Sequence, residues 1–200
     1  MAVQLRLILA SQSPRRRELL SLTGIPFETA SIDIDETFDL SLPVERNVTE
    51  ISLKKAEAVR SSLRLPADET VVLGSDTTVL LDGRPLGKPL DYEHAFSMLS
   101  ALQGRTHEVL TGFCILHGQE AVLDYARTVV EFAPMTPAEI NRYIEIMKPF
   151  DKAGSYGIQD PILACFIRRI DGCYYNVVGL PVSKVFAALK PLFPFPPSEP

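Results

Sequence analysis

Apolar and polar positions change period along the chain in a way that predicts alternating strands and helices near the N-terminus. The apolar run Leu5–Ala10 predicts a strand. The following segment, Pro14–Thr23, predicts a helix closed by Gly24, a residue type favoured just after a helix. Apolar residues then recur at about helical period from Val48 to Leu63, where Asn47 and Glu50 have capping-box spacing. An acidic connector separates these two helices, with Asp33, Asp35, Glu36 and Asp39.

The middle of the chain reads as short strands interrupted by polar residues. Val71–Leu73 predicts a buried strand that ends at the polar segment Gly74-Ser75-Asp76-Thr77. Thr78–Leu81 continues as a strand into Asp82-Gly83, which is typical of a type I′ hairpin turn. We therefore expect Asp76 to lie in a loop at the end of a strand.

The second half predicts further helices and two hairpins. One helix is capped by Asp91 and ended by Gly104, and another opens with the capping box of Thr136 to Glu139 and runs to about Met147. The remaining predicted elements are the strands Val109–Leu116 and Ala121–Phe132 around His117-Gly118, a loop Asp151–Pro161, a hairpin of Ala164–Ile170 and Tyr174–Val178 around Asp171-Gly172, and a helix Val182–Leu189. The sum is a mixed α/β chain.

Composition bounds the domain count and the class of ligand. The 200 residues suit one domain over 1–190, followed by a tail over 191–200 in which five prolines favour extended backbone. A formal net charge of -5 disfavours a broad nucleic-acid-binding face, which needs excess Lys and Arg. The three cysteines, Cys114, Cys165 and Cys173, form no CxxC pair and favour reduced thiols. With no apolar stretch near the ~20 residues of a membrane span, we expect a cytoplasmic protein.

The most informative local feature is the helix start after the first strand. Ser13 is the expected N-cap and Pro14 the first helical residue, and Arg15, Arg16 and Arg17 fill the first turn. Cations at a helix N-terminus oppose its dipole unless an anion is bound there by free backbone N–H groups and guanidinium groups. A solvated basic first turn is the alternative interpretation.

Other polar positions have both a functional and a structural interpretation. Glu36 either ligates a cation or faces water, Asp76 either acts chemically or forms a turn, and Lys88 either binds phosphate or is a surface lysine. The segment Gly83–Pro89 is similar to a P-loop, but it is one residue short and has Pro89 in place of the Ser or Thr that holds magnesium. His94, His107 and His117 lack zinc-type spacing, and no Gly-x-Ser-x-Gly motif is present.

Taken in order, the motifs resemble the Maf family over roughly residues 5–190. They are Ser11-x-Ser13-Pro14-Arg15-Arg16-x-x-Leu19-Leu20, Asp35-Glu36, Lys55-Ala56, Gly74-Ser75-Asp76-Thr77, Gly87-Lys88-Pro89, the segment 151–159 and Val178-Gly179-Leu180-Pro181. The chain departs from the family after Gln159, where Gly is common and Asp160 stands here. The resemblance implies an elongated mixed α/β sheet with flanking helices, similar to inosine triphosphate pyrophosphatases, with two lobes around a cleft.

The resemblance also implies an activity and a set of roles. Maf proteins are nucleoside triphosphate pyrophosphatases that use a divalent metal, and the motifs Gly-x-Asp-Thr and Tyr-Gly-Ile-Gln resemble the branch acting on dTTP and UTP. By motif match Asp76 is the proton acceptor, and Arg15, Thr77 and Gln159 are substrate-specificity residues. Homodimers occur in such families, although the sequence identifies no interface.

The chemistry of the residues agrees with these roles. We expect Ser13, Arg16, Lys55 and Lys88 to bind phosphates, and Glu36 and Asp76 to ligate Mg²⁺ or Mn²⁺. Asp76 serves as the base, as a metal ligand or as both, and the sequence does not separate these roles. The Gln159 amide can accept from the N3–H of uracil or thymine and donate to a carbonyl, which cytosine does not match. Two alternatives are a nucleotide-binding regulator of septum formation or cell division without catalysis, and a 7-methyl-GTP pyrophosphatase; 5-modified pyrimidine triphosphates are further candidate substrates.

Overall fold

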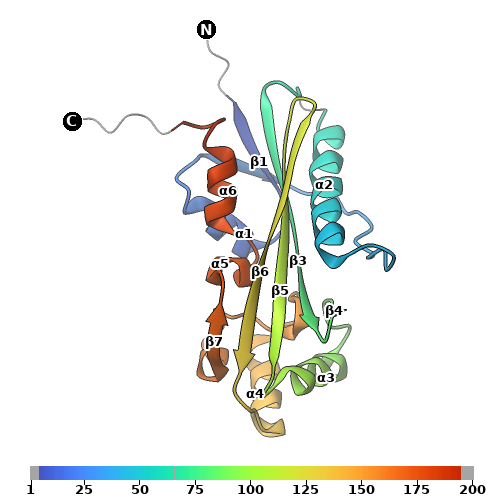
Figure 1. Ribbon diagram of the computed structural model, residues 1–200, viewed down its shortest axis with the longest axis vertical. Helices are drawn as coiled ribbons and strands as arrows, with labels where there is room; N and C mark the ends of the chain where they lie inside the picture. The colour runs from blue at the N-terminus through green and yellow to red at the C-terminus, as the bar shows by residue number, and fades with distance from the viewer. Residues whose placement is uncertain (1–4, 65, 195–200) are drawn as a thin grey trace, which may run out of the picture. The chain divides into compact units, whose positions relative to one another are not determined.

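The computed structural model describes residues 5–64 and 66–194 as one mixed β-sheet with helices beside it (Figure 1). The strands of the described residues are β1 Arg6–Ala10, β2 Phe27–Ala30, β3 Thr70–Leu81, β4 Arg84–Leu86, β5 Thr106–His117, β6 Glu120–Phe132 and β7 Ile167–Asp171. Their order is β2-β1-β3-β5-β6-β7, and β4 pairs with β3 outside this path. Strand β1 is parallel to β2 and β3, whereas the β3–β4 and β6–β7 pairs are antiparallel. The predicted mixed α/β sheet is confirmed.

The helices begin mostly at the predicted caps. They are α1 Pro14–Ser21, α2 Val44–Ser62, α3 Tyr92–Leu102, α4 Pro137–Met147, α5 Tyr174–Val178 and α6 Val182–Leu189, with 3-10 turns η1 Ala153–Ser155 and η2 Leu163–Phe166. The side chains of Ser13, Asp91 and Thr136 each accept a backbone N–H of the first turn, as predicted. Across the part of the chain that the structure describes, no helix combines the length and apolarity needed to cross a membrane.

Helix α2 begins a full turn earlier than predicted, so the capping box expected at Asn47 is wrong. The N-cap is Pro43, which offers no side-chain hydrogen bond, and Asn47 is buried inside the helix. Its Nδ2 donates to the carbonyls of Asp39 at 2.9 Å and Pro43 at 3.2 Å, and its Oδ1 accepts from the Asp39 N–H at 2.7 Å. Asn47 therefore attaches the acidic connector to the helix instead of capping the helix N-terminus.

The predicted loop at Asp76 is also wrong, because β3 is one continuous strand of 12 residues. Every residue of β3 is buried except the half-buried Thr77. Polar residues are tolerated there because they find partners: the Ser75 hydroxyl donates to the Gly112 carbonyl at 2.9 Å, and Asp76 accepts from Lys55. Asp76 therefore lies within a continuous strand, with strand residues before and after it, and not in a turn.

Three further segments differ from prediction. Tyr174–Val178 is the helix α5 and not the second strand of a hairpin, and β7 begins only at Ile167, after the 3-10 turn η2. The short strands β2 and β4 were not predicted. The type I′ turn at Asp82-Gly83 is confirmed, with φ of 52° and 74°, and the P-loop look-alike folds into this turn and β4.

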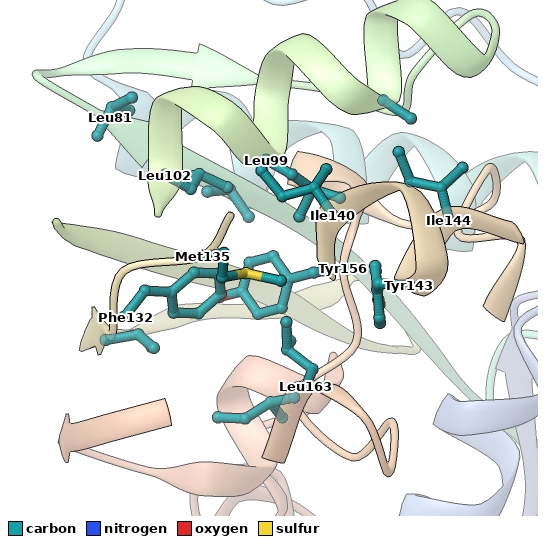
Figure 2. Packing of buried hydrophobic residues seen from close by; sticks show 14 of the residues in the cluster. Leu81, Leu99, Leu102, Phe132, Met135, Ile140, Tyr143, Ile144, Tyr156 and Leu163 are labelled. Carbon is teal, nitrogen blue, oxygen red and sulfur yellow. The ribbon is translucent and has the colours of Figure 1, made fainter. Parts of the chain in front are cut away.

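The chain divides into two compact units, in line with the two predicted lobes. Unit 1 comprises residues 1–76, 111–125 and 179–200, and unit 2 comprises 77–110 and 126–178. Unit 1 has a core of aliphatic residues from β1, α2, β3 and β5, among them Ile8, Val59 and Val72. In unit 2 a larger core gathers Leu99 of α3, Phe132 of β6, Tyr143 of α4, Leu163 of η2 and Tyr156 of the loop after η1 (Figure 2). The single domain predicted over 1–190 stays a prediction, and of the predicted tail 191–200, residues 195–200 lie outside the described residues.

Candidate active site

The arginine-rich start of α1 is built as the sequence predicts. The Arg16 backbone N–H donates to the Ser13 hydroxyl at 3.4 Å, and the Ser13 N–H donates to the Ser11 hydroxyl at 3.2 Å. No acidic side chain lies in the first turn of this helix. The first turn thus presents backbone N–H groups and guanidinium groups and contributes no carboxylate of its own, which suits an anion.

Arg16 is held by a residue far away in sequence. Its Nε donates to the Gly179 carbonyl at 2.9 Å. Burial lowers the pKa of Arg16, while the nearby carboxylates of Asp76 and Glu36 act in the opposite direction and Arg15 reinforces the lowering. Arg15, Arg16, Glu36 and Asp76 therefore share one electrostatic neighbourhood in unit 1. The Gly179 carbonyl is a supporting group whose role the sequence motif gave no means of predicting.

At the centre of this neighbourhood Lys55 joins two carboxylates. Its Nζ lies 2.7 Å from Asp76 Oδ1 and 3.0 Å from Glu36 Oε1. The Lys55 and Asp76 side chains are 11% and 9% exposed, whereas that of Glu36 is 46% exposed, so one carboxylate faces the interior and the other faces solvent. Glu36 comes from the acidic connector, Lys55 from α2 and Asp76 from β3.

Two glycines allow α2 to lie close enough to the strands for this contact. A Cβ built on Gly74 of β3 would collide with the Ser52 carbonyl of α2, and one built on Gly112 would lie 2.6 Å from the Val48 carbonyl oxygen. Real Cβ atoms do not approach backbone so closely, so only glycine fits at either position. Lys55 follows one turn after Ser52 and reaches Asp76, two residues beyond Gly74.

The donor set of this cluster fits a magnesium-type cation that arrives with phosphate. Mg²⁺ is commonly bound through one or two carboxylates plus substrate phosphate oxygens, and Glu36 and Asp76 converge on a single cationic atom, Lys55 Nζ. Over residues 5–64 and 66–194, no group of three or more His, Cys, Asp or Glu side chains gathers that would hold a metal unaided.

The remaining predicted site residues belong to unit 2. Thr77 is the half-buried residue of β3, Lys88 is exposed in the segment after β4, and Gln159 is exposed in the loop before η2. The Gly154 N–H donates to the Gly87 carbonyl at 3.0 Å, which attaches the loop of Gln159 to the segment of Lys88. The structure thus groups Ser13, Arg15, Arg16, Glu36, Lys55 and Asp76 in unit 1, and Thr77, Lys88 and Gln159 in unit 2.

The histidine buried in unit 2 supports this loop. His107 Nε2 lies 2.7 Å from the Tyr156 hydroxyl, and both rings pack edge to face with Phe132. Figure 2 shows Phe132 and Tyr156 in this core. Burial lowers the pKa of His107 to about 4 and raises the pKa of Tyr156, so both are neutral near pH 7. The Phe132–Tyr156 ring centroids are 4.9 Å apart, so Tyr156 anchors the loop that carries Gln159 in the core.

Comparison with known proteins identifies the family. The family model described as Maf-like protein matches residues 6–192. A protein of Chlorobaculum tepidum named dTTP/UTP pyrophosphatase is 75% identical over 189 residues, 94% of this chain and 96% of that protein. A protein of Pelodictyon phaeoclathratiforme with the same name is 54% identical over 184 residues, 92% of this chain and 96% of that protein.

Among solved structures, one described as a nucleoside-triphosphatase / dITP/XTP pyrophosphatase from Mycobacterium abscessus is similar with a TM-score of 0.45 and 15% identity. It covers 96% of this chain and 100% of that one. The family assignment depends on the match over residues 6–192 and on the high identity to the curated relatives. On these grounds the chain belongs to the Maf family.

Proposed function

We propose that the protein hydrolyses dTTP and UTP to the nucleoside monophosphate and pyrophosphate. The observation that carries this proposal is the convergence of the Glu36 and Asp76 carboxylates on Lys55, beside the arginine-rich start of α1. The names of the 75% and 54% identical relatives support the same substrates. Membership of the Maf family supports the reaction class.

The charges of unit 1 suit a nucleoside triphosphate. Its phosphates carry about four negative charges, which must be neutralised before water can attack the α-phosphorus. Arg15, Arg16 and Lys55 supply cationic groups, and the α1 N-terminus supplies backbone N–H donors. In this assignment Ser13, Arg16, Lys55 and Lys88 bind phosphate oxygens.

Asp76 is the proposed proton acceptor. Its carboxylate is buried in the middle of β3 and held by the Lys55 ammonium at 2.7 Å, so it is fixed in position and shielded from bulk water. It would take the proton of the attacking water as the new P–O bond forms and the bond to pyrophosphate breaks. A Mg²⁺ or Mn²⁺ ion ligated by Glu36 and Asp76 would supply further charge neutralisation at the phosphate oxygens.

Base selection is assigned to Gln159, with Thr77 and Arg15 as further specificity residues. The Gln159 side chain is exposed while its neighbours in the loop are buried, so its amide is free to meet a ligand. An amide offers one acceptor and one donor side by side, which matches N3–H and a carbonyl of uracil or thymine. The amide of a fixed Gln159 would meet cytosine in the wrong orientation.

The three cysteines support a cytoplasmic location. Cys114, Cys165 and Cys173 are all free thiols, and burial raises the pKa of Cys114 to about 12, which keeps it protonated and unreactive. Free thiols are usual in the reducing cytoplasm.

The test is pyrophosphate release from dTTP, UTP, CTP, GTP and 7-methyl-GTP, with Mg²⁺, with Mn²⁺ and with excess EDTA. We expect turnover of dTTP and UTP that EDTA abolishes. Turnover only of a triphosphate with another base would support the proposed reaction and refute the assignment of dTTP and UTP as substrates. No release with either metal would favour a nucleotide-binding regulator without catalysis.

A further inference from the structure

The loop that carries Gln159 is anchored at almost every residue except Gln159 itself. Residues 154–158 and 160 are buried, and Gln159 is exposed. Within unit 2, Ser155 Oγ lies 3.1 Å from the Met98 sulfur, and the Tyr156 hydroxyl lies 2.7 Å from His107 Nε2. A loop attached in this way to several elements presents one side chain in a defined position.

A single hydroxyl group forms hydrogen bonds with the loop on both sides of Gln159. The Tyr143 hydroxyl of α4 accepts from the Gly157 N–H at 3.1 Å and donates to Asp160 Oδ2 at 2.6 Å. Tyr143 is fully buried and Asp160 is 5% exposed. Burial, and then the Asp160 carboxylate, raise the pKa of Tyr143, so the hydroxyl stays protonated and able to donate.

The Asp160 carboxylate is also fixed by its other neighbours. Lys152 Nζ lies 3.6 Å from Asp160 Oδ2, and the Asp160 N–H donates to the Gly157 carbonyl at 3.0 Å. A Cβ built on Gly157 would lie 2.8 Å from Asp160 Oδ1, so the carboxylate lies directly against the Gly157 backbone. The segment Gly157–Asp160 is therefore a closed turn with Gln159 near its tip.

We infer that Tyr143 and Asp160 are positioning residues for base selection, holding the Gln159 backbone so that its amide distinguishes uracil from cytosine. This inference rests on the proposed function of Gln159. A glutamine side chain rotates freely, and the two pyrimidines require opposite amide orientations. A fixed backbone limits where this amide can lie against the edge of the base. The Tyr143 hydroxyl fixes the loop on both sides of Gln159, at the Gly157 N–H and at the Asp160 carboxylate.

The experiment measures kcat and KM for UTP, dTTP and CTP in Tyr143→Phe, Asp160→Ala and Asp160→Asn. For Tyr143→Phe and Asp160→Ala we expect the ratio of kcat/KM for UTP to that for CTP to fall about tenfold, the effect of one lost hydrogen bond. The fall should come from KM for UTP, with kcat changed by less than about twofold. Asp160→Asn keeps an acceptor for Tyr143 but loses the charge, so its ratio should fall about threefold.

Asp171→Asn is the matched control. It makes the same chemical change in unit 2 on an exposed side chain that forms an ion pair with the exposed Arg169. Its ratio of kcat/KM for UTP to that for CTP should match that of the parent protein. Thermal melting of each variant precedes the kinetics. If Tyr143→Phe and Asp160→Ala do not fold, the isosteric Asp160→Asn, compared with Asp171→Asn, decides the question.

Two results would overturn the inference, and they are distinguishable. Folded variants with equal losses for UTP and CTP, or with no loss, would show that the pair only stabilises unit 2. A parent protein that hydrolyses UTP and CTP equally, or hydrolyses neither, would refute the proposed function itself before any variant is compared.

Discussion

Lys55 of unit 1 and Gln159 of unit 2 are both proposed to contact the nucleotide, but their surroundings differ in kind. The Lys55 ammonium is held by two carboxylates, the buried Asp76 at 2.7 Å and the exposed Glu36 at 3.0 Å. Gln159 is presented by a loop that is buried in an aromatic core and held by the Tyr143 and Tyr156 hydroxyls, the first of which donates to the Asp160 carboxylate. A charged partner can exchange one ionic contact for another when phosphate binds, whereas a packed loop cannot rearrange without loss of stability. The first region is therefore suited to chemistry and the second to recognition.

The strongest way to test this contrast is Asp76→Asn. We expect pyrophosphate release to fall about a thousandfold, because the proposed proton acceptor is removed while the shape is kept. The melting temperature should change little, since the amide oxygen still accepts from Lys55 at the position now 2.7 Å away. The check is steady-state kinetics with dTTP beside a thermal melt. Activity within about tenfold of the parent protein would exclude Asp76 as the base.

Gly74→Ala tests whether the charged cluster depends on the close approach of α2 to β3. The new Cβ would collide with the Ser52 carbonyl, and we expect unfolding free energy to drop by about 3 kcal/mol or more. Gly87→Ala is the matched control, since a Cβ there meets nothing within 4 Å. Urea unfolding of the two variants checks this, and equal stabilities would contradict the packing argument.

His107 sharpens the contrast from the side of unit 2, through pH and stability. Its pKa is lowered from 6.5 to about 4, so between these values the unfolded chain binds more protons than the folded one. Stability should therefore decline as the pH drops from 6.5 toward 4, by at most about 3 kcal/mol from this residue. In His107→Gln the free energy of unfolding should decline less as the pH falls. Urea unfolding at about pH 7, 5.5 and 4.5 checks this, since these values cover the interval between the two pKa values. Parallel pH profiles of the two proteins would refute the assignment.

The smallest effect on stability is expected for an exposed ion pair that lies outside the surroundings of both Lys55 and Gln159. Asp82→Asn removes the bidentate contact with Arg105, whose nitrogen lies 2.7 and 2.9 Å from the two carboxylate oxygens. Asn keeps the left-handed turn conformation, so stability should fall by less than about 0.5 kcal/mol. A melting temperature lowered as much as by Gly74→Ala would show that exposed charges matter more here than burial.

Sequence patterns located the elements whose signals are local. Caps with polar side chains marked the starts of α1, α3 and α4. The start of α2 was missed because Pro43 caps it without a side chain and Asn47 is used to bind the connector. Helix α5 was mistaken for a strand because Tyr174–Val178 is rich in residues that favour strands. Its helical form is supported by tertiary contacts, with Asn176 donating to the Val109 carbonyl and the Thr128 hydroxyl.

The chemical roles of the site residues stay predictions, and the contacts among them could not be read from the sequence. The motifs name Glu36, Lys55 and Asp76 as separate site residues, and nothing local says that one lysine joins the two carboxylates. The three come from a connector, a helix and a strand, so their meeting depends on the glycines that admit α2. Tyr143 was expected only as part of a helix, because a tyrosine in an amphipathic pattern reads as core.

The exposed position of Gln159 within a buried loop has a consequence for how such a protein can change. Because its side chain adds nothing to the core, replacing it should alter ligand choice with little effect on folding. Its neighbours have no such freedom, since each is buried or hydrogen-bonded to another element. Natural variation or laboratory selection for a new base should therefore accumulate at this one codon, with the supporting loop left intact.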